Sequence, residues 1–172
     1  MGLMAAYHGC FHSTLAYGII LWGHSSASSA IFKSQRRAVR VVAGIPFRAD
    51  CRKAFIELNI LTLPCLYILQ CLCHVHSDPS IYDKRSTQHH YDLRNKDDLS
   101  LNFLRLSKSR CSINYWGIIF YNSLPEVVRE LGGVPFKRCL KKFLKLNAFS
   151  TFEKFLNCDK SSLINVSHFV PT

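Results

Sequence analysis

Residues 28–43 place apolar and basic side chains on opposite faces of one predicted α-helix. The inward stripe recurs at helical spacing and consists of Ile31, Gln35, Ala38, Val39 and Val42. The outward stripe, at i, i+3, i+4 and i+7, consists of Lys33, Arg36, Arg37 and Arg40. We expect Ser28 or Ser29 to cap this helix, and Gly44 and Pro46 to end it. A helix with one wholly basic face must bury the other, which favours a helical fold with a real core.

The same design recurs near the C-terminus, where Pro135 is expected to open a helix. Its apolar stripe consists of Phe136, Cys139, Leu140, Phe143 and Leu144. Its opposite face consists of Lys137, Arg138, Lys141, Lys142 and Lys145. Neither helix has an acidic residue on its basic face, so charge pairing within the helix does not explain these cations.

The positive charge is concentrated in these two blocks. The 172 residues contain 22 Lys and Arg against 11 Asp and Glu, a formal net charge of +11. Residues 1–49 hold five basic residues and no acidic one, and residues 131–146 hold five more, again with none. Such a surface favours a polyanionic partner, either nucleic acid or an anionic membrane.

The remaining segments also favour helices. Apolar spacing predicts a helix over 2–22, Asp50 is expected to cap one through Leu58, and Thr62 with Pro64 to open a core helix through His76. Residues 111–121 fit either a strand or a buried helix, of which we favour the helix. A capping box at 123–126 predicts one further helix, up to residues 132–133.

We therefore expect a mainly α fold, a single helical domain with a long polar connection near residues 77–102. Its parts are a helical region at 1–76, the polar connection at 77–110, a second helical region at 111–157 and a frayed tail at 158–172. Trp22 and Trp116 lie in apolar stretches and are expected in the core rather than as base-stacking platforms.

Eight cysteines would suit a disulfide framework in a secreted chain, but residues 1–17 lack the basic start and the apolar core of a signal peptide. We expect reduced, mostly buried thiols in an intracellular protein, nuclear or cytoplasmic and not secreted. The most apolar stretch, 60–75, is interrupted by polar residues, so we expect no membrane span.

Several short stretches, in the same order, resemble the region after the polymerase domain of non-LTR retrotransposon reverse transcriptases of the jockey-like kind. They are residues 11–13 (FHS), 15–18 (LAYG), 21–23 (LWG), 35–40 (QRRAVR), 43–46 (AGIP), 51–52 (CR), 61–64 (LTLP), 66–68 (LYI), 91–96 (YDLRNK), 117 (G), 121–125 (YNSLP) and 143–149 (FLKLNAF). Together they extend over most of the chain. His90 and Asp92 depart from the pattern, since relatives more often have His-Asn-Tyr-Asn there.

The resemblance implies a helical region beside the primer and template, downstream of a palm that bears the catalytic aspartates. That palm is not in this chain, and the predicted first helix starts without a cap, so we expect a piece of a longer protein without catalytic activity of its own. The parent polymerase would use Mg²⁺ through residues not present here, and the chain itself is expected to need no cofactor. The expected partners are RNA or DNA backbone in a primer-template duplex and the remainder of the reverse transcriptase.

The nine basic residues of the two faces, Lys33 to Arg40 and Lys137 to Lys145, are the predicted nucleic-acid-binding residues. A different class of function remains open. In that alternative, the chain is a small basic helical interaction protein, and the helix after Pro135 binds an anionic membrane or an acidic protein partner.

Two groups of residues resemble metal sites. Asp97-Asp98 could be taken for a polymerase aspartate pair, but they follow Arg94, Asn95 and Lys96 in a polar connection, so we expect a solvated or capping role. His8 and His12 have i, i+4 spacing without a third ligand nearby in sequence.

Cys71, Cys73, His74 and His76 have soft ligands but the wrong spacing for one ion. On a helix, Cys71 pairs with His74 and Cys73 with His76, and the two pairs point about 160° apart. We therefore predict that chelator titration followed by circular dichroism leaves the helical signal unchanged, because no structural metal supplies folding energy. Loss of helix on chelation that zinc restores would contradict this prediction.

Overall fold

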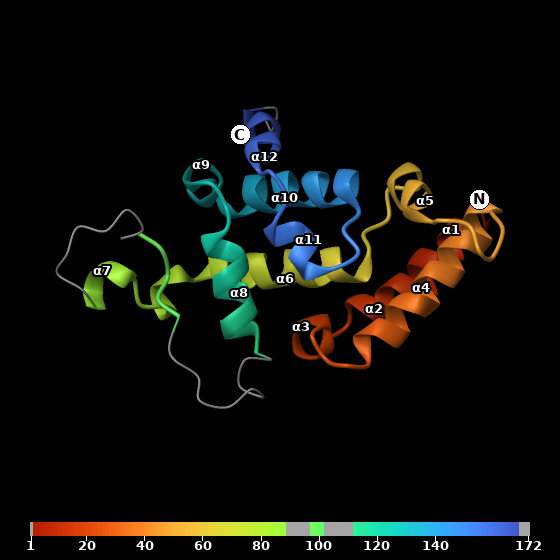
Figure 1. The fold of residues 1–172 in the computed structure, drawn as a ribbon, viewed down its shortest axis with the longest axis horizontal. Helices are drawn as coiled ribbons and strands as arrows, with labels where there is room; N and C mark the ends of the chain where they lie inside the picture. Colours follow the sequence, from red (N-terminus) through yellow and green to blue (C-terminus); the bar gives the residue numbers. More distant parts are fainter. Residues whose placement is uncertain (1, 89–96, 102–111, 169–172) are drawn as a thin grey trace.

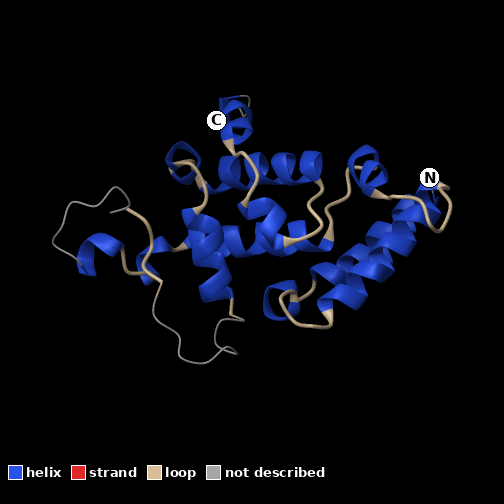
Figure 2. Cartoon of the chain, in the orientation of Figure 1, coloured by secondary structure: helices blue, strands red, loops and turns tan. Residues whose placement is uncertain are grey.

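A computed structural model describes residues 2–88, 97–101 and 112–168 of the chain. Within these ranges the chain is mainly helical, as expected, and has no β-sheet (Figure 2). In the described residues, β-type backbone pairing is limited to one isolated antiparallel bridge, between Lys84 and Leu99.

The N-terminal segment is helical in four pieces rather than one continuous helix. They are α1 (Gly2–Ala6), the π-helix η1 (Tyr7–His12), α2 (Ser13–Ala16) and α3 (Ile19–Trp22). The predicted single helix over 2–22 was wrong at Gly18, whose φ of 59° is left-handed and breaks the α-helix. Apolar spacing survives such a break, so it could not reveal the turn.

The helix α4 (Ser28–Ala43) has nearly the predicted bounds and runs alongside the N-terminal helices (Figure 1). It ends at Gly44, which has a left-handed φ of 66° and whose N–H donates to helical carbonyl oxygens. The serine cap does not form, since Ala27 occupies the N-cap position without a side-chain bond. Gln35 and Val39 are fully buried, which confirms the inward stripe.

Two helices follow, α5 (Arg52–Glu57) and α6 (Leu63–Ser77). Asp50 accepts a hydrogen bond from the Arg52 backbone N–H at 3.2 Å, while Cys51 stands at the N-cap of α5. The predicted Thr62 cap of α6 is confirmed, because its hydroxyl accepts from the Cys65 N–H. The same hydroxyl donates to the Phe149 carbonyl, 87 residues away.

The polar connection contains the 3₁₀ turn η2 (Pro79–Ile81) and α7 (Arg85–Gln88). Its residues 89–96, with the HHYD sequence and the whole YDLRNK motif, lie outside the described residues, as do 102–111.

The next helices are α8 (Ile113–Asn122), α9 (Glu126–Arg129) and α10 (Gly133–Asn147). The preference for a helix near 111–121 is confirmed by α8. The predicted capping box was wrong, since Pro125 is the N-cap of α9 and the Ser123 hydroxyl donates to the Phe120 carbonyl. The apolar stripe of α10 is buried as predicted.

The chain continues with α11 (Phe152–Leu156) and α12 (Ser161–His168). The structure thus differs from the expected frayed tail over 161–168. Leu163 is fully buried, and its carbonyl accepts a 3.7 Å contact from the Cys139 thiol of α10. The helix α12 packs against α9 and α10, and no periodicity in the local sequence predicts these contacts.

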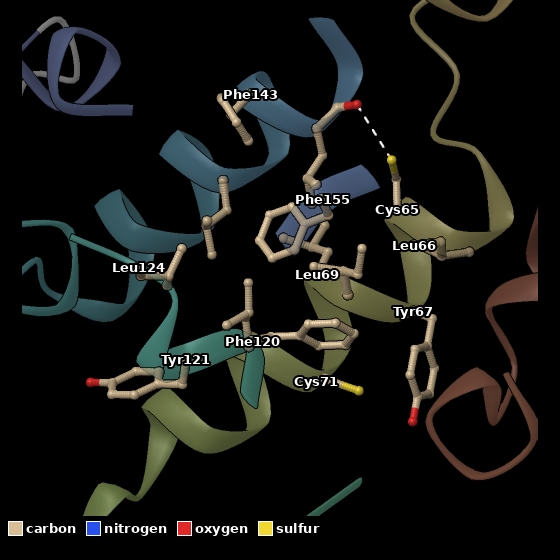
Figure 3. Packing of buried hydrophobic residues seen from close by; sticks show 14 of the residues in the cluster. Cys65, Leu66, Tyr67, Leu69, Cys71, Phe120, Tyr121, Leu124, Phe143 and Phe155 are labelled. Atoms are coloured by element: carbon tan, nitrogen blue, oxygen red, sulfur yellow. Dashed lines mark hydrogen bonds between the residues drawn. The ribbon is translucent and has the colours of Figure 1, made fainter. Parts of the chain in front are cut away.

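The core lies around α6, which packs against α3, α8 and α10 (Figure 1). Aromatic rings fill the space between these helices. The rings of Phe120 and Phe155 meet edge to face at 5.7 Å (Figure 3), and Tyr67 and Phe120 do so at 6.4 Å. The Cys65 thiol contacts the carbonyl oxygens of Leu144 and Phe149 at 3.6 and 3.7 Å.

All seven described cysteines are free thiols, and most of these are buried, as expected. Burial raises the pKa of Cys65 and of Cys71 to about 12, so both stay protonated at neutral pH. They act as small apolar core residues.

Gln35 is the buried polar residue that joins three segments. Its Nε2 donates to the Tyr7 hydroxyl at 3.0 Å and to the Leu61 carbonyl at 2.9 Å, and its Oε1 accepts from the Leu63 N–H at 2.8 Å. These bonds connect η1, α4 and the entry to α6.

We predict that Gln35→Leu destabilises the protein by about 1–3 kcal/mol for each backbone group left without a partner. The measurement is the midpoint of urea unfolding. Ser34→Ala, an exposed neighbour on the same helix, is the control and should change stability by less than about 0.5 kcal/mol. Equal midpoints for the two variants would contradict the role given to Gln35.

Candidate nucleic-acid interface

The four cations of α4 are not equally available. Lys33 and Arg37 are exposed, whereas Arg36 and Arg40 are half-buried. The Nε of Arg40 donates to the Ala49 carbonyl at 2.9 Å, which holds this side chain against the loop after the helix. The Arg37 guanidinium lies 5.6 Å from the centre of the Phe47 ring. The helical spacing predicts that the four cations share a face, but it does not predict which guanidinium hydrogen-bonds to the loop after the helix.

Most of the cations of α10 are exposed to solvent. Lys137, Arg138, Lys141 and Lys142 are exposed, and Lys145 is half-buried. Burial lowers the pKa of Lys145, and the charge of Lys141 one turn earlier lowers it further. The burial on the opposite side of the helix, where Phe136 and Leu140 are fully covered, forces these cations outward.

The π-helix η1 adds histidines to the α10 cations. The rings of His8 and His12 lie 5.4 Å apart, and the Nδ1 of His12 is buried with no hydrogen-bond partner. Burial lowers the pKa of His12, and the positive charges of His8, Lys141 and Lys145 lower it further. Lys141 and Lys145 therefore lie close enough to His12 for their charges to be felt there. The i, i+4 spacing of His8 and His12 resembles a metal motif but does not predict this proximity, which depends on the packing of distant segments.

The two basic helices are held in one body by shared neighbours. Both α4 and α10 pack against α5 and α6. The Arg52 guanidinium of α5 donates to the Asn147 carbonyl at the end of α10, at 3.0 Å. In Figure 1, α5 lies beside the C-terminal end of α10. The relative placement of the two faces is thus set by the tertiary structure.

Within the described part of the chain, none of the nine predicted cations forms an ion pair. The ion pairs found there join Lys84 to Asp97 at 3.9 Å and Arg129 to Asp98 at 3.0 Å. Cations with no carboxylate partner in the described ranges are available to an external anion.

Asp98 has a different role from the solvated or capping one expected. Its carboxylate and the Arg129 side chain are both largely covered, and Arg129 also lies over the Tyr121 ring at 6.0 Å. Asp97 is exposed. The Asp98–Arg129 ion pair thus attaches the described end of the polar connection to α9.

The cysteine and histidine group at the end of α6 is dispersed over the helix. Cys71 is buried and His74 exposed, while the His76 ring stacks on Phe136 at 3.8 Å. Among the described residues, no group of three or more His, Cys, Asp or Glu side chains is placed to hold a metal ion.

Both tryptophans contact the core, as expected. Trp116 stacks on Phe120 at 5.5 Å, and the Trp22 indole N–H donates to the Tyr17 carbonyl at 3.0 Å. Over the described ranges, the helices are too short or too polar to cross a bilayer.

No family model, curated protein or solved structure matches the chain in comparisons with known proteins.

We predict that Lys141→Gln raises the pKa of His12 towards its ordinary value of 6.5, because a nearby positive charge that disfavours the imidazolium is removed. The pH dependence of the ring proton shifts in NMR measures this change. Lys142→Gln is the matched control, since Lys142 is not among the charges acting on His12 and should leave its pKa unchanged. The same pKa in both variants would show that Lys141 does not act on η1.

Proposed function

We propose that this chain is the region downstream of the palm of a non-LTR retrotransposon reverse transcriptase, and that it binds the nucleic-acid backbone without catalysis of its own. The observation that carries the binding proposal is the set of exposed cations on α4 and α10 with no carboxylate partner among the described residues. The ordered motifs of the sequence support the family assignment.

Six of the nine predicted nucleic-acid-binding residues are exposed and can reach a phosphate. The exposed members are Lys33, Arg37, Lys137, Arg138, Lys141 and Lys142. The Nε–H of Arg40 already donates to the Ala49 carbonyl. Arg40 therefore contributes positive charge, but not its full set of guanidinium donors, to the binding of a phosphate. Because the proposed contacts join cations on helix surfaces to phosphates rather than to base edges, the proposed binding is indifferent to sequence.

The mechanism is electrostatic. Each Lys or Arg that neutralises a phosphate releases condensed counterions, and the entropy of that release drives association. A primer-template duplex with the rest of the polymerase is the proposed partner. The cations would hold the duplex while a palm elsewhere in the parent protein performs the chemistry with Mg²⁺.

A second function is favoured by apolar side chains beside the cations. Phe47 is 67% exposed next to Arg37, and Leu146 is 55% exposed next to Lys145. Exposed apolar and cationic side chains together suit an anionic membrane surface or an acidic protein groove.

We predict that affinity for a primer-template duplex falls steeply with salt, with a log-log slope of about −0.9 per phosphate neutralised on B-form DNA. Arg37→Gln and Lys141→Gln should each reduce the slope by about one unit and leave the fold intact. Fluorescence anisotropy over a salt series, with circular dichroism on each variant, provides the measurement.

Lys84→Gln is the matched control, because Lys84 is exposed, pairs with Asp97 and immediately precedes α7. In Figure 1, α7 lies far from α4. It should leave the slope unchanged. Unchanged affinity and slope in both test variants would refute phosphate contact by these faces. Binding to phosphatidylserine vesicles but not to duplex at the same salt would favour the second function.

A further inference from the structure

A pocket of about 310 Å³ lies between α4, α5 and the segment around α11. Three cationic side chains line it, Arg36, Arg52 and Lys154, against a single carboxylate, Asp50. The pocket is called the Arg36 pocket below. Its volume is at the lower end of the range of small-molecule sites, about 300–1,000 Å³.

Arg36 is the unusual member of this group. Its guanidinium lies 5.2 Å from the centre of the Phe32 ring, and its Nε is buried with no hydrogen-bond partner. A buried guanidinium N–H without an acceptor costs free energy. Because Arg36 lines the pocket, an anion bound there would lie beside its positive charge and stabilise the half-buried guanidinium. Phe32 holds the side chain in place, so little order would be lost on binding.

The other two cations are positioned by their own hydrogen bonds. Arg52 donates from one Nη to the Asn147 carbonyl at 3.0 Å, which leaves its other guanidinium N–H groups for a ligand. Lys154 donates to the Ser150 hydroxyl at 3.0 Å and has two further ammonium protons. Three like charges around one small volume repel one another, and an anion is the ligand that relieves the repulsion.

The rest of the lining restricts the class of anion. The Asp50 carboxylate would repel a small inorganic anion, but it can accept a hydrogen bond from a hydroxyl or amino group of a larger ligand. Phe55 and Phe149 supply an apolar wall. A nucleotide combines a phosphate with hydroxyl donors and an apolar ring, and it matches all three features.

We propose that the Arg36 pocket binds the phosphate of a nucleotide unit, with its sugar or base against the aromatic wall and Asp50. The proposal differs from the duplex binding of the helix faces, because Arg52, Lys154 and Asp50 are not part of those faces. Arg36 was predicted on the α4 face, but it is half-buried and lines the pocket. The nucleotide can be a free mononucleotide or the phosphorylated end of a strand, and both present the same chemistry.

The test is titration of the folded chain with adenosine 5′-monophosphate, followed by calorimetry and amide chemical shifts in NMR. We expect saturable binding, with shifts near residues 36, 52 and 154, and none with adenosine. Arg36→Gln and Lys154→Gln should each weaken binding about tenfold, the effect of losing one charge-assisted hydrogen bond. Lys154 is exposed, so its substitution leaves the fold intact even if that of Arg36 does not.

Arg37→Gln is the matched control, since Arg37 is adjacent in sequence but outside the pocket lining. It should change nucleotide affinity by less than about twofold while lowering duplex affinity, which separates the two proposals. Competition by an oligonucleotide with a 5′-phosphate, compared with the same strand without it, identifies the source of the nucleotide. No binding of the monophosphate, equal binding of adenosine, or unchanged affinity in Arg36→Gln and Lys154→Gln would overturn the proposal.

Discussion

The hydrogen bonds of Gln35 are the constraint on which the arrangement of the N-terminal half depends. A fully buried amide must find partners for its donor and acceptor groups, and here they come from Tyr7, Leu61 and Leu63. These bonds determine the rotation of α4 about its axis. With Gln35 inward, the cations of α4 face outward or border the Arg36 pocket.

The C-terminal half depends instead on apolar packing around α6. Its aromatic and thiol side chains fill the space beneath α8, α10 and α11, and the shape of that core determines which face of α10 is covered. Thr62 joins the halves, because its hydroxyl caps α6 and also donates to the Phe149 carbonyl. The loop after α10, with Ser150, and the helix α11, with Lys154, are thereby brought against α4 and α5, where the Arg36 pocket forms.

Local signals predicted α4, α6 and α10 well, since strong helical spacing and a Gly or Thr-Pro boundary act within a few residues. They failed where a distant contact decided the outcome. The predicted capping box does not form, because the Ser123 hydroxyl donates to the Phe120 carbonyl instead. The segment 161–168 is helical rather than frayed, with Leu163 buried beside α10. The candidate site was predicted as two faces, without Arg52, Lys154, His8 or His12.

Helix periodicity is enough to predict the helical class and the outward direction of the two basic stripes, because it places these cations opposite apolar residues. The tertiary structure decided how the cations are used. It tied Arg40 to a loop, left the Nε of Arg36 buried without a partner, and placed Lys141 and Lys145 where they act on His12. The physical reason is that burial and charge proximity depend on contacts between residues far apart in the chain, which local periodicity does not contain.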